Sequence, residues 1–152
     1  MNFLHIRQLF LDRLIRFYGP FFGAAVKPVE ISEDHRYIKI EMPLTFYNKN
    51  YMGTQFGGSL YSMVDPWYML MLIKNLGKDY IVWDKSATIE FKKPGRGKVH
   101  AEFTLTQERI DEIKSFVTEN TKMDAHFEVK ILDEQNNLIA RVDKVVYVRR
   151  KS

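Results

Sequence analysis

The chain has 152 residues and a mass of 18.0 kDa, the size of one ordinary domain. Hydrophobic residues make up 45% of the sequence and charged residues 28%, which is typical of a globular protein and excludes a collagen-like or low-complexity chain. The 23 Lys and Arg exceed the 19 Asp and Glu only modestly, so no nucleic acid partner is expected. The absence of cysteine excludes disulfides, thiol nucleophiles and thiolate metal sites, and favours the cytoplasm.

The first segment is predicted to be helical. Apolar residues recur every three or four positions from Phe3 to Tyr18, with arginines between them, and Gly19 and Pro20 would end this amphipathic helix. Its charged residues interrupt any secretory signal, and no apolar run reaches the length of a membrane span, so neither is expected. We expect the helix to pack on the core, with attachment to a membrane surface as the alternative.

Strand patterns dominate the remainder of the chain. Alternating apolar residues and β-branched or aromatic runs predict strands over residues 37–42, 80–91, 99–106, 125–131 and 138–148. Turn residues at 93–97 and at 133–137 predict two hairpins, and a short helix fits residues 108–120. We therefore expect one α+β domain over 1–152, with a helical extension at 1–26 and a core at 27–152.

A second helix differs from the first because it is apolar on nearly every side. It is predicted over residues 59–76 and ends at Gly77. A helix of this kind must be surrounded by protein, and only a curved sheet can cover so much of it in a chain of this length. The predicted arrangement is a long central helix wrapped by an antiparallel sheet, in the order strand, helix, four strands.

Asp65 is the only acidic residue in this apolar helix. Burying a carboxylate costs several kcal/mol unless it is paired, hydrogen-bonded or protonated, so Asp65 requires an explanation. It is either a carboxylate with a chemical role at the end of a cleft or the N-cap of a helix that restarts at Pro66, since Asp-Pro is typical of such a start.

A glycine-containing segment, residues 50–58, immediately precedes this helix. Gly57 and Gly58 allow a ligand to approach the backbone closely, and the first turn of the helix then presents unpaired N–H groups with a partial positive charge. Such a place suits a carbonyl oxygen that develops negative charge.

These residues and their spacing resemble the signature of a known family. Asn50, Gly53, the Gly57-Gly58 pair and Asp65 stand in the register of the hot-dog-fold acyl-CoA thioesterases of the phenylacetate-pathway type. The order of predicted elements over most of the chain is also that of a hot-dog domain, here with an extra N-terminal amphipathic helix. The sequence is most similar to a branch of uncharacterised thioesterase-like bacterial proteins in which phenylalanine precedes the glycine pair.

The resemblance implies a homodimer or homotetramer with two sites at the dimer interface. Asp65 would act as general base or nucleophile on a thioester, the Gly58 N–H would polarise the thioester carbonyl, and Asn50 would position the attacking water or the acid. Coenzyme A would enter as part of an acyl-CoA or acyl-carrier substrate, and no separate cofactor is implied. One carboxylate with one oxyanion site can suffice because a thioester is already activated.

Phe56 departs from the family pattern, in which histidine stands at this position. The change removes a side chain able to orient water or to hydrogen-bond the thioester. A non-catalytic protein that binds acyl-CoA or a fatty acyl group is therefore the alternative function.

Further residues are candidates for substrate contact. Lys92, Lys93 and Arg96 could bind the phosphates of coenzyme A, or they form an ordinary solvated hairpin. Tyr61 and Tyr68 could line an acyl tunnel, or they belong to the core. The substrate-binding set is completed by Thr54, Phe56 and Gly57. No metal is expected, because no two of the four histidines have the spacing of metal ligands.

Overall fold

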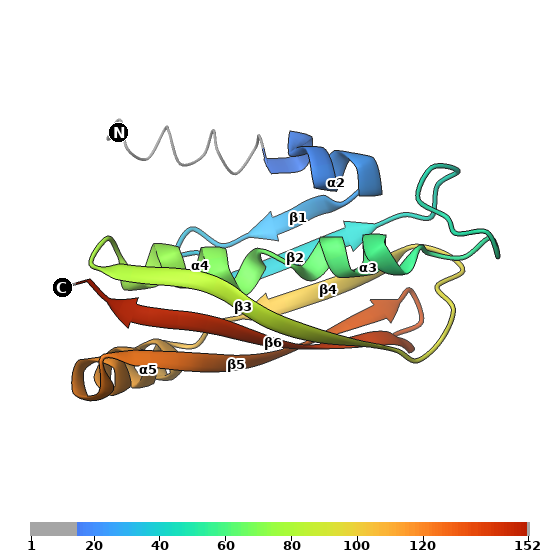
Figure 1. The fold of residues 1–152 in the computed structure, drawn as a ribbon. Helices are drawn as coiled ribbons and strands as arrows, with labels where there is room; N and C mark the ends of the chain where they lie inside the picture. The colour runs from blue at the N-terminus through green and yellow to red at the C-terminus, as the bar shows by residue number, and fades with distance from the viewer. Residues whose placement is uncertain (1–14, 152) are drawn as a thin grey trace, which may run out of the picture.

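The computed structural model describes residues 15–151 of the chain (Figure 1). The helix expected from residue 3 lies mostly outside the described residues. The described chain starts with a single 3-10 turn, η1 (Ile15–Phe17), and continues with the short helix α2 (Gly19–Ala24). Pro20 lies in the first turn of α2, where its missing N–H costs no hydrogen bond.

Six antiparallel strands form one sheet in the order β1-β2-β4-β5-β6-β3. The strands are β1 (Lys27–Ile31), β2 (Tyr37–Met42), β3 (Tyr80–Phe91), β4 (Val99–Thr104), β5 (Lys122–Asp133) and β6 (Leu138–Arg150). The five predicted strands are confirmed. Sequence analysis missed β1, an edge strand that contains a proline and buries none of its side chains fully, so it carries no alternating pattern.

The strand order corrects one of the two predicted hairpins. Residues 133–137 do join two paired strands, β5 and β6. Residues 93–97 do not, because β3 and β4 are separated in the sheet by β5 and β6. Turn residues indicate where the chain changes direction but not which strand will lie next to it, and β3 pairs instead with β6, about fifty residues further along the chain.

The central helix is two helices rather than one. Figure 1 shows α3 (Gly57–Val64) and α4 (Trp67–Leu76) end to end along the concave side of the sheet. The chain leaves the helix at Asp65 and Pro66, because proline has no N–H to continue the ladder. The indole Nε1 of Trp67 donates to the carbonyl of Met63 at 2.7 Å, which replaces one backbone bond lost at the break.

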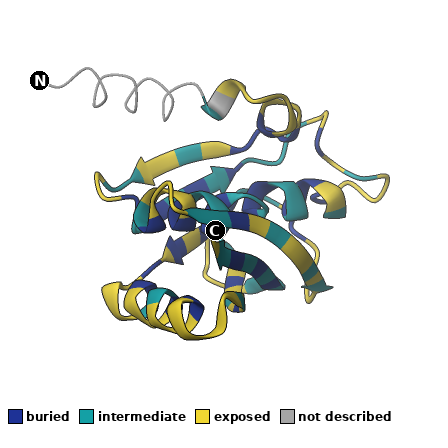
Figure 2. Cartoon of the chain, turned by 60° about the vertical axis from the view of Figure 1, so that its left-hand side comes forward, coloured by how far each residue is buried: buried dark blue, intermediate teal, exposed yellow. Residues whose placement is uncertain are grey.

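The core lies between this helix pair and the sheet. Met63, Val64, Met71 and Leu72 are fully buried there, and the inward residues of β2, β4, β5 and β6 face them. The helix α5 (Gln107–Asn120) buries Ile110, Ile113 and Val117 and exposes its remaining faces (Figure 2). No helix in the described part of the chain is long and apolar enough to cross a membrane.

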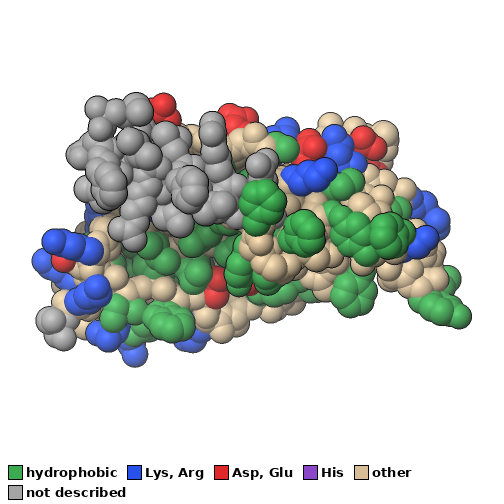
Figure 3. Space-filling view, turned by 90° about the horizontal axis from the view of Figure 1, so that it is seen from above, with side chains coloured by type: hydrophobic (Ala, Val, Ile, Leu, Met, Phe, Trp, Pro, Cys, Tyr) green, Lys and Arg blue, Asp and Glu red, His purple; other side chains and the backbone are tan. Residues whose placement is uncertain are grey.

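One surface of the molecule exposes many large apolar side chains. In the view from above, they gather over α2 and over the loop that connects β2 with α3 (Figure 3). The exposed residues of these two segments are Phe22, Phe46, Tyr47, Tyr51, Met52 and Phe56. Contiguous apolar surface of this kind is typical of an interaction site.

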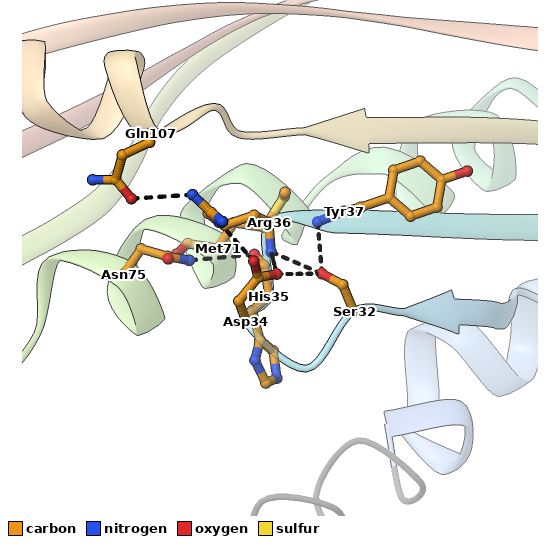
Figure 4. Close-up of polar contacts among 8 residues, drawn as sticks. All are labelled: Ser32, Asp34, His35, Arg36, Tyr37, Met71, Asn75 and Gln107. Atoms are coloured by element: carbon orange, nitrogen blue, oxygen red, sulfur yellow. Dashed lines mark hydrogen bonds and ion pairs between the residues drawn. The ribbon is translucent and has the colours of Figure 1, made fainter.

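The turn between β1 and β2 is fixed by polar contacts (Figure 4). The Ser32 hydroxyl donates to Asp34 Oδ1 at 2.7 Å, and Arg36 Nε donates to Asp34 Oδ2 at 2.7 Å. These two contacts lower the pKa of Asp34 to about 2. The Asn75 amide donates to the His35 carbonyl at 3.3 Å, which ties the turn to the end of α4.

Candidate active site

The helix break determines the environment of Asp65. This residue follows the last residue of α3, and its side chain is 44% exposed. It does not cap α4, whose N-cap residue is Pro66 and which has no side-chain capping bond. The capping interpretation is therefore wrong, and the carboxylate of Asp65 has other partners.

The first partner is Lys144, which lies in the middle of β6 with only 1% of its side chain exposed. Its Nζ lies 2.7 Å from Asp65 Oδ1 and also donates to the backbone carbonyl of Asp65. The same Nζ lies 3.2 Å from Asp84 Oδ2. A buried ammonium must be paired and hydrogen-bonded to be tolerated, and these three oxygens meet that requirement.

The second partner is Tyr61, one turn before Asp65 in α3. Its hydroxyl donates to Asp65 Oδ1 at 2.7 Å. Burial raises the pKa of Tyr61 well above its ordinary value, and the bond to Asp65 raises it further, so the phenol remains a donor. Among the described residues Oδ1 of Asp65 thus has two side-chain donors, whereas Oδ2 has none.

Asp84, in β3, is the second carboxylate of this cluster. Its side chain is 25% exposed, and its Oδ1 is buried without a hydrogen-bond partner among the described residues. Burial raises the pKa of Asp84, while Lys144 opposes that rise. The strand bulges directly after it, between Asp84 and Ser86, a distortion that often accompanies functional sites.

Sequence analysis missed both Lys144 and Asp84. Lys144 did carry a signal, because it occupies an inward position of its strand between Val142 and Val146. A lysine in the apolar register of a predicted strand indicates a buried charge and therefore a partner. Asp84 carried a weaker signal, since the bulge in β3 changes which residues face inward.

A separate pocket of about 530 Å³ lies at the other end of α3. It brings together several predicted site residues from two segments, namely Asn50, Thr54, Phe56 and Gly57 from the glycine-containing loop and Lys92 and Lys93 from the connection after β3. Asp65, Gly58, Tyr61, Tyr68 and Arg96 are not among the residues that line it.

Asn50 maintains the shape of this loop. Its Oδ1 accepts the backbone N–H groups of Met52 at 2.9 Å and Thr54 at 3.1 Å. Its Nδ2 donates to Thr54 Oγ1 at 2.9 Å. Gly53 adopts a φ of 77°, a conformation that glycine favours, and completes the turn. The proposed role of Asn50 toward water stays a prediction.

The two glycines at the start of α3 lie against neighbouring aromatic rings. A Cβ at Gly57 would lie 2.9 Å from the Phe91 ring, and one at Gly58 would overlap the Phe56 ring. The first backbone bond of the helix is from Leu60 N to Phe56 O at 3.0 Å, so the N–H groups of Gly57 and Gly58 precede the helical ladder. The Phe56 ring, 54% exposed, therefore lies against the backbone that carries the Gly58 N–H.

The remaining candidates, Lys92 and Tyr68, have partners within the chain. Lys92 pairs with Glu90 at 2.7 Å. Tyr68 belongs to the core, where its ring stacks on Phe127 with 4.3 Å between centroids, and its hydroxyl donates to the Glu128 carbonyl at 3.3 Å. Its role in substrate binding stays a prediction. Among residues 15–151, no group of three or more His, Asp or Glu is arranged to hold a metal ion.

The two catalytic candidates of α3 lie at its opposite ends. Gly58 is the second residue of the helix, and Asp65 directly follows its last residue. Seven residues at 1.5 Å rise each separate them by about 10 Å along the helix axis. The two candidates are therefore well separated within one chain.

Solved structures similar to this one define its fold. A protein of unknown function from Pseudomonas aeruginosa, described as a probable thioesterase, has a TM-score of 0.81 and 20% identity, covering 94% of this chain and 96% of its own. A thioesterase from Haemophilus influenzae has a TM-score of 0.67 and 16% identity, with 92% and 88% covered. A protein of unknown function from Chlorobaculum tepidum has a TM-score of 0.72 and 13% identity, with 93% of each chain covered.

These similarities establish the hot-dog fold that the sequence resemblance implied. The chain belongs to the family described as "Domain of unknown function (DUF4442)", which it matches over residues 7–148. No curated protein matches the sequence.

Proposed function

We propose that this protein is an acyl-CoA thioesterase whose sites form between two copies of the chain. The observation that carries the proposal is the state of the Asp65 carboxylate, with Oδ1 held by Tyr61 and Lys144 and Oδ2 without a partner among the described residues. A carboxylate that is fixed through one oxygen and open at the other suits a general base or nucleophile. The thioesterase names of the P. aeruginosa and H. influenzae proteins support the same reaction class.

In the simplest mechanism, Asp65 Oδ2 accepts a proton from water as the water oxygen attacks the thioester carbonyl carbon. Negative charge then develops on the carbonyl oxygen, where the Gly58 N–H and the positive end of α3 stabilise it. The C–S bond breaks, the thiolate of coenzyme A leaves, and the proton held by Asp65 neutralises it. With Asp65 as nucleophile, an acyl-enzyme anhydride would form first and water would then hydrolyse it.

The separation of Gly58 from Asp65 is the reason for placing the site between two copies. The Gly58 N–H of one protomer would face the Asp65 carboxylate of its partner, which gives two equivalent sites about a two-fold axis. The strand β3 supports this arrangement, because it is twelve residues long, lies at the edge of the sheet and contains no proline. A second β3 could pair with it and extend the sheet across the dimer.

The coenzyme A half of the substrate would bind at the pocket that begins at the glycine-containing loop. Lys93 lines this pocket and is the better candidate for a phosphate contact, because Lys92 already pairs with Glu90. Arg96 is in the same connection but outside the pocket lining, so it would meet only a phosphate that extends beyond the pocket.

One observation favours the alternative function, a non-catalytic protein that binds acyl-CoA. The Phe56 ring lies against Gly58, and this apolar ring supplies no hydrogen-bond donor to a thioester. In that case the pocket and the lysines would bind the ligand, and Asp65 would contribute only to the fold.

The experiment that separates the two functions is thiol release from short, medium, long and aromatic acyl-CoAs, comparing wild type with Asp65→Asn. We expect wild type to hydrolyse at least one class, and Asp65→Asn to lose about 100-fold or more in kcat, the usual contribution of a general base. Asp79→Asn, at an exposed position after α4, is the matched control and should retain full activity.

Two results would contradict the proposal. Equal turnover by wild type and Asp65→Asn would remove Asp65 from the chemistry. Saturable binding of a non-hydrolysable acyl-CoA thioether, with no turnover of any ester by wild type, would establish the binding function instead.

A further inference from the structure

We propose that Lys144 and Asp84 are positioning residues of the Asp65 carboxylate. Lys144 orients this carboxylate, and Asp84 weakens the electrostatic stabilisation that Lys144 gives it, because both carboxylates pair with the same ammonium. This inference rests on the proposed function, and it adds to that function two residues outside the glycine-containing loop. It follows from the contacts of a single buried ammonium group.

The Lys144 ammonium is surrounded by hydrogen-bond acceptors. A lysine ammonium has three N–H donors and no acceptor. Here the three acceptors around Nζ are Asp65 Oδ1, the Asp65 backbone carbonyl and Asp84 Oδ2. With 1% of its side chain exposed, Lys144 depends on these oxygens rather than on water. Each of its three donors therefore has an acceptor within the chain.

Lys144 also determines the geometry of Asp65. The first backbone bond at the start of α4 is from Leu70 N to Pro66 O at 2.9 Å, so the Asp65 carbonyl precedes the new helical ladder. Lys144 binds that carbonyl and the carboxylate of the same residue, which fixes both the backbone and the side chain of Asp65. Together with the Tyr61 hydroxyl on Oδ1, this leaves Oδ2 as the oxygen available to substrate or water.

Asp65 and Asp84 share one ammonium, that of Lys144, so the negative charge of the cluster is only half compensated. The groups that face Asp65 are Tyr61 from α3, Lys144 from β6 and, across the lysine, Asp84 from β3. Burial raises the pKa of Asp84, Lys144 opposes the rise, and the charge of Asp65 adds to it. The charge of Asp65 thus acts on Asp84, and the two carboxylates share Lys144.

The test is the pH dependence of kcat for wild type, Asp84→Asn and Lys144→Met on the best acyl-CoA substrate. Asp84→Asn removes the negative charge that competes with Asp65 for Lys144, so we expect the acidic limb of the kcat profile to move to lower pH. In Lys144→Met the compensating charge is gone, so the acidic limb should move to higher pH by about one unit or more, with a fall in kcat and little change in KM.

Two further variants separate positioning from folding. Lys144→Met leaves two carboxylates without a cation, so Lys144→Met/Asp84→Asn is prepared as well, and it should fold better while still showing the lower kcat. Lys85→Met removes an exposed lysine from the neighbouring bulge, where it pairs with Asp124 at 2.6 Å, and should leave the profile unchanged. Circular dichroism and thermal melting establish that each variant is folded.

A second readout does not depend on turnover. In protein labelled with ¹³C-aspartate, the carboxyl signal of Asp84 reports its titration directly. We expect the pKa of Asp84 to fall in Asp65→Asn, where a neighbouring negative charge is lost, and to rise in Lys144→Met. If wild type hydrolyses no ester, the proposed function fails while this titration still decides whether the cluster is coupled.

The inference is overturned if the acidic limb is the same in wild type, Asp84→Asn and Lys144→Met. It is also overturned if both variants shift the limb in the same direction, or if Asp84 titrates identically in wild type and Asp65→Asn. Each of these results would reduce Lys144 to a structural ion pair.

Discussion

At the scale of single residues, Phe56 offers the most direct test of the proposed chemistry. Its ring lies against Gly58, the residue whose backbone N–H would stabilise the thioester oxygen in the proposed mechanism. We expect Phe56→His to raise kcat about tenfold, because an imidazole can donate one hydrogen bond that the phenyl ring cannot. Steady-state thiol release with the best acyl-CoA measures this change.

Phe56→Ala is the control for that experiment, since it removes the ring without adding a donor. An equal rise in both variants would mean that the ring merely blocks the site. A fall in both would show that Phe56 contacts the substrate, which the position of its ring in the pocket lining allows. Only a rise confined to Phe56→His supports the hydrogen bond.

Only some residues of the candidate site could be predicted from the sequence. Asp65 was predictable, because a lone carboxylate in an apolar helix needs a partner. The partner itself lies 79 residues away in sequence, on another element, and a single sequence cannot pair the two. Lys144 could have been flagged as a buried charge from the alternation in β6, but its contact with Asp65 depends on how the sheet curves around the helices.

At the scale of elements, the break between α3 and α4 is the feature that creates the site. Asp-Pro was predicted to mark either a site or a restart of the helix, and the structure contains the restart without the cap. Two side chains stabilise the break, Trp67 on the Met63 carbonyl and Lys144 on the Asp65 carbonyl. A continuous helix would use both carbonyls for backbone bonds, so Lys144 would lose one acceptor.

We therefore expect Pro66→Ala to lower kcat by about tenfold to 100-fold, because a carboxylate displaced by roughly 1 Å loses activity on that order. The free energy of unfolding should change by no more than about 1 kcal/mol, since alanine favours the helix while proline restricts the unfolded chain. Activity assays and thermal melts on the same preparations measure the two quantities. Pro28→Ala in β1 is the control, and full kcat in Pro66→Ala would show that the break has no catalytic role.

The elements themselves were largely predictable, for identifiable reasons. The strands 37–42 and 80–91 were predicted with the observed bounds, because alternation and β-branched composition are local signals. The pairing of β3 with β6 was not predicted, since it is a long-range contact that turn residues do not encode. The exposed edge strand β1 was not predicted, because it buries too little side-chain surface to show an alternating pattern.

At the scale of the whole molecule, the proposed site depends on which protomer would supply each catalytic group. Gly58 and Asp65 of one chain are about 10 Å apart along α3, by the helical rise, which is why we propose that the site forms between two copies. The edge strand β3 offers free backbone groups for that copy, and it exposes Trp83 by 67%. The loop that exposes Tyr51 and Met52 offers apolar surface that a partner could cover.

Mixing two inactive variants tests this arrangement. Asp65→Asn lacks the carboxylate, and Gly58→Pro lacks the N–H. A Cβ at position 58 would also displace the exposed Phe56 ring, so Phe56→Ala refolded alone controls for that displacement. If each site takes Gly58 from one protomer and Asp65 from the other, a hybrid dimer contains one site with both groups intact and one with neither. Unfolding and refolding an equal mixture should then restore about a quarter of wild-type kcat, because half the dimers are hybrids of a two-fold assembly and half their sites are intact.

Sedimentation analysis confirms the dimers, and each variant refolded alone is the control. No recovery in a mixture shown to contain hybrid dimers would contradict a site that takes Gly58 from one protomer and Asp65 from the other.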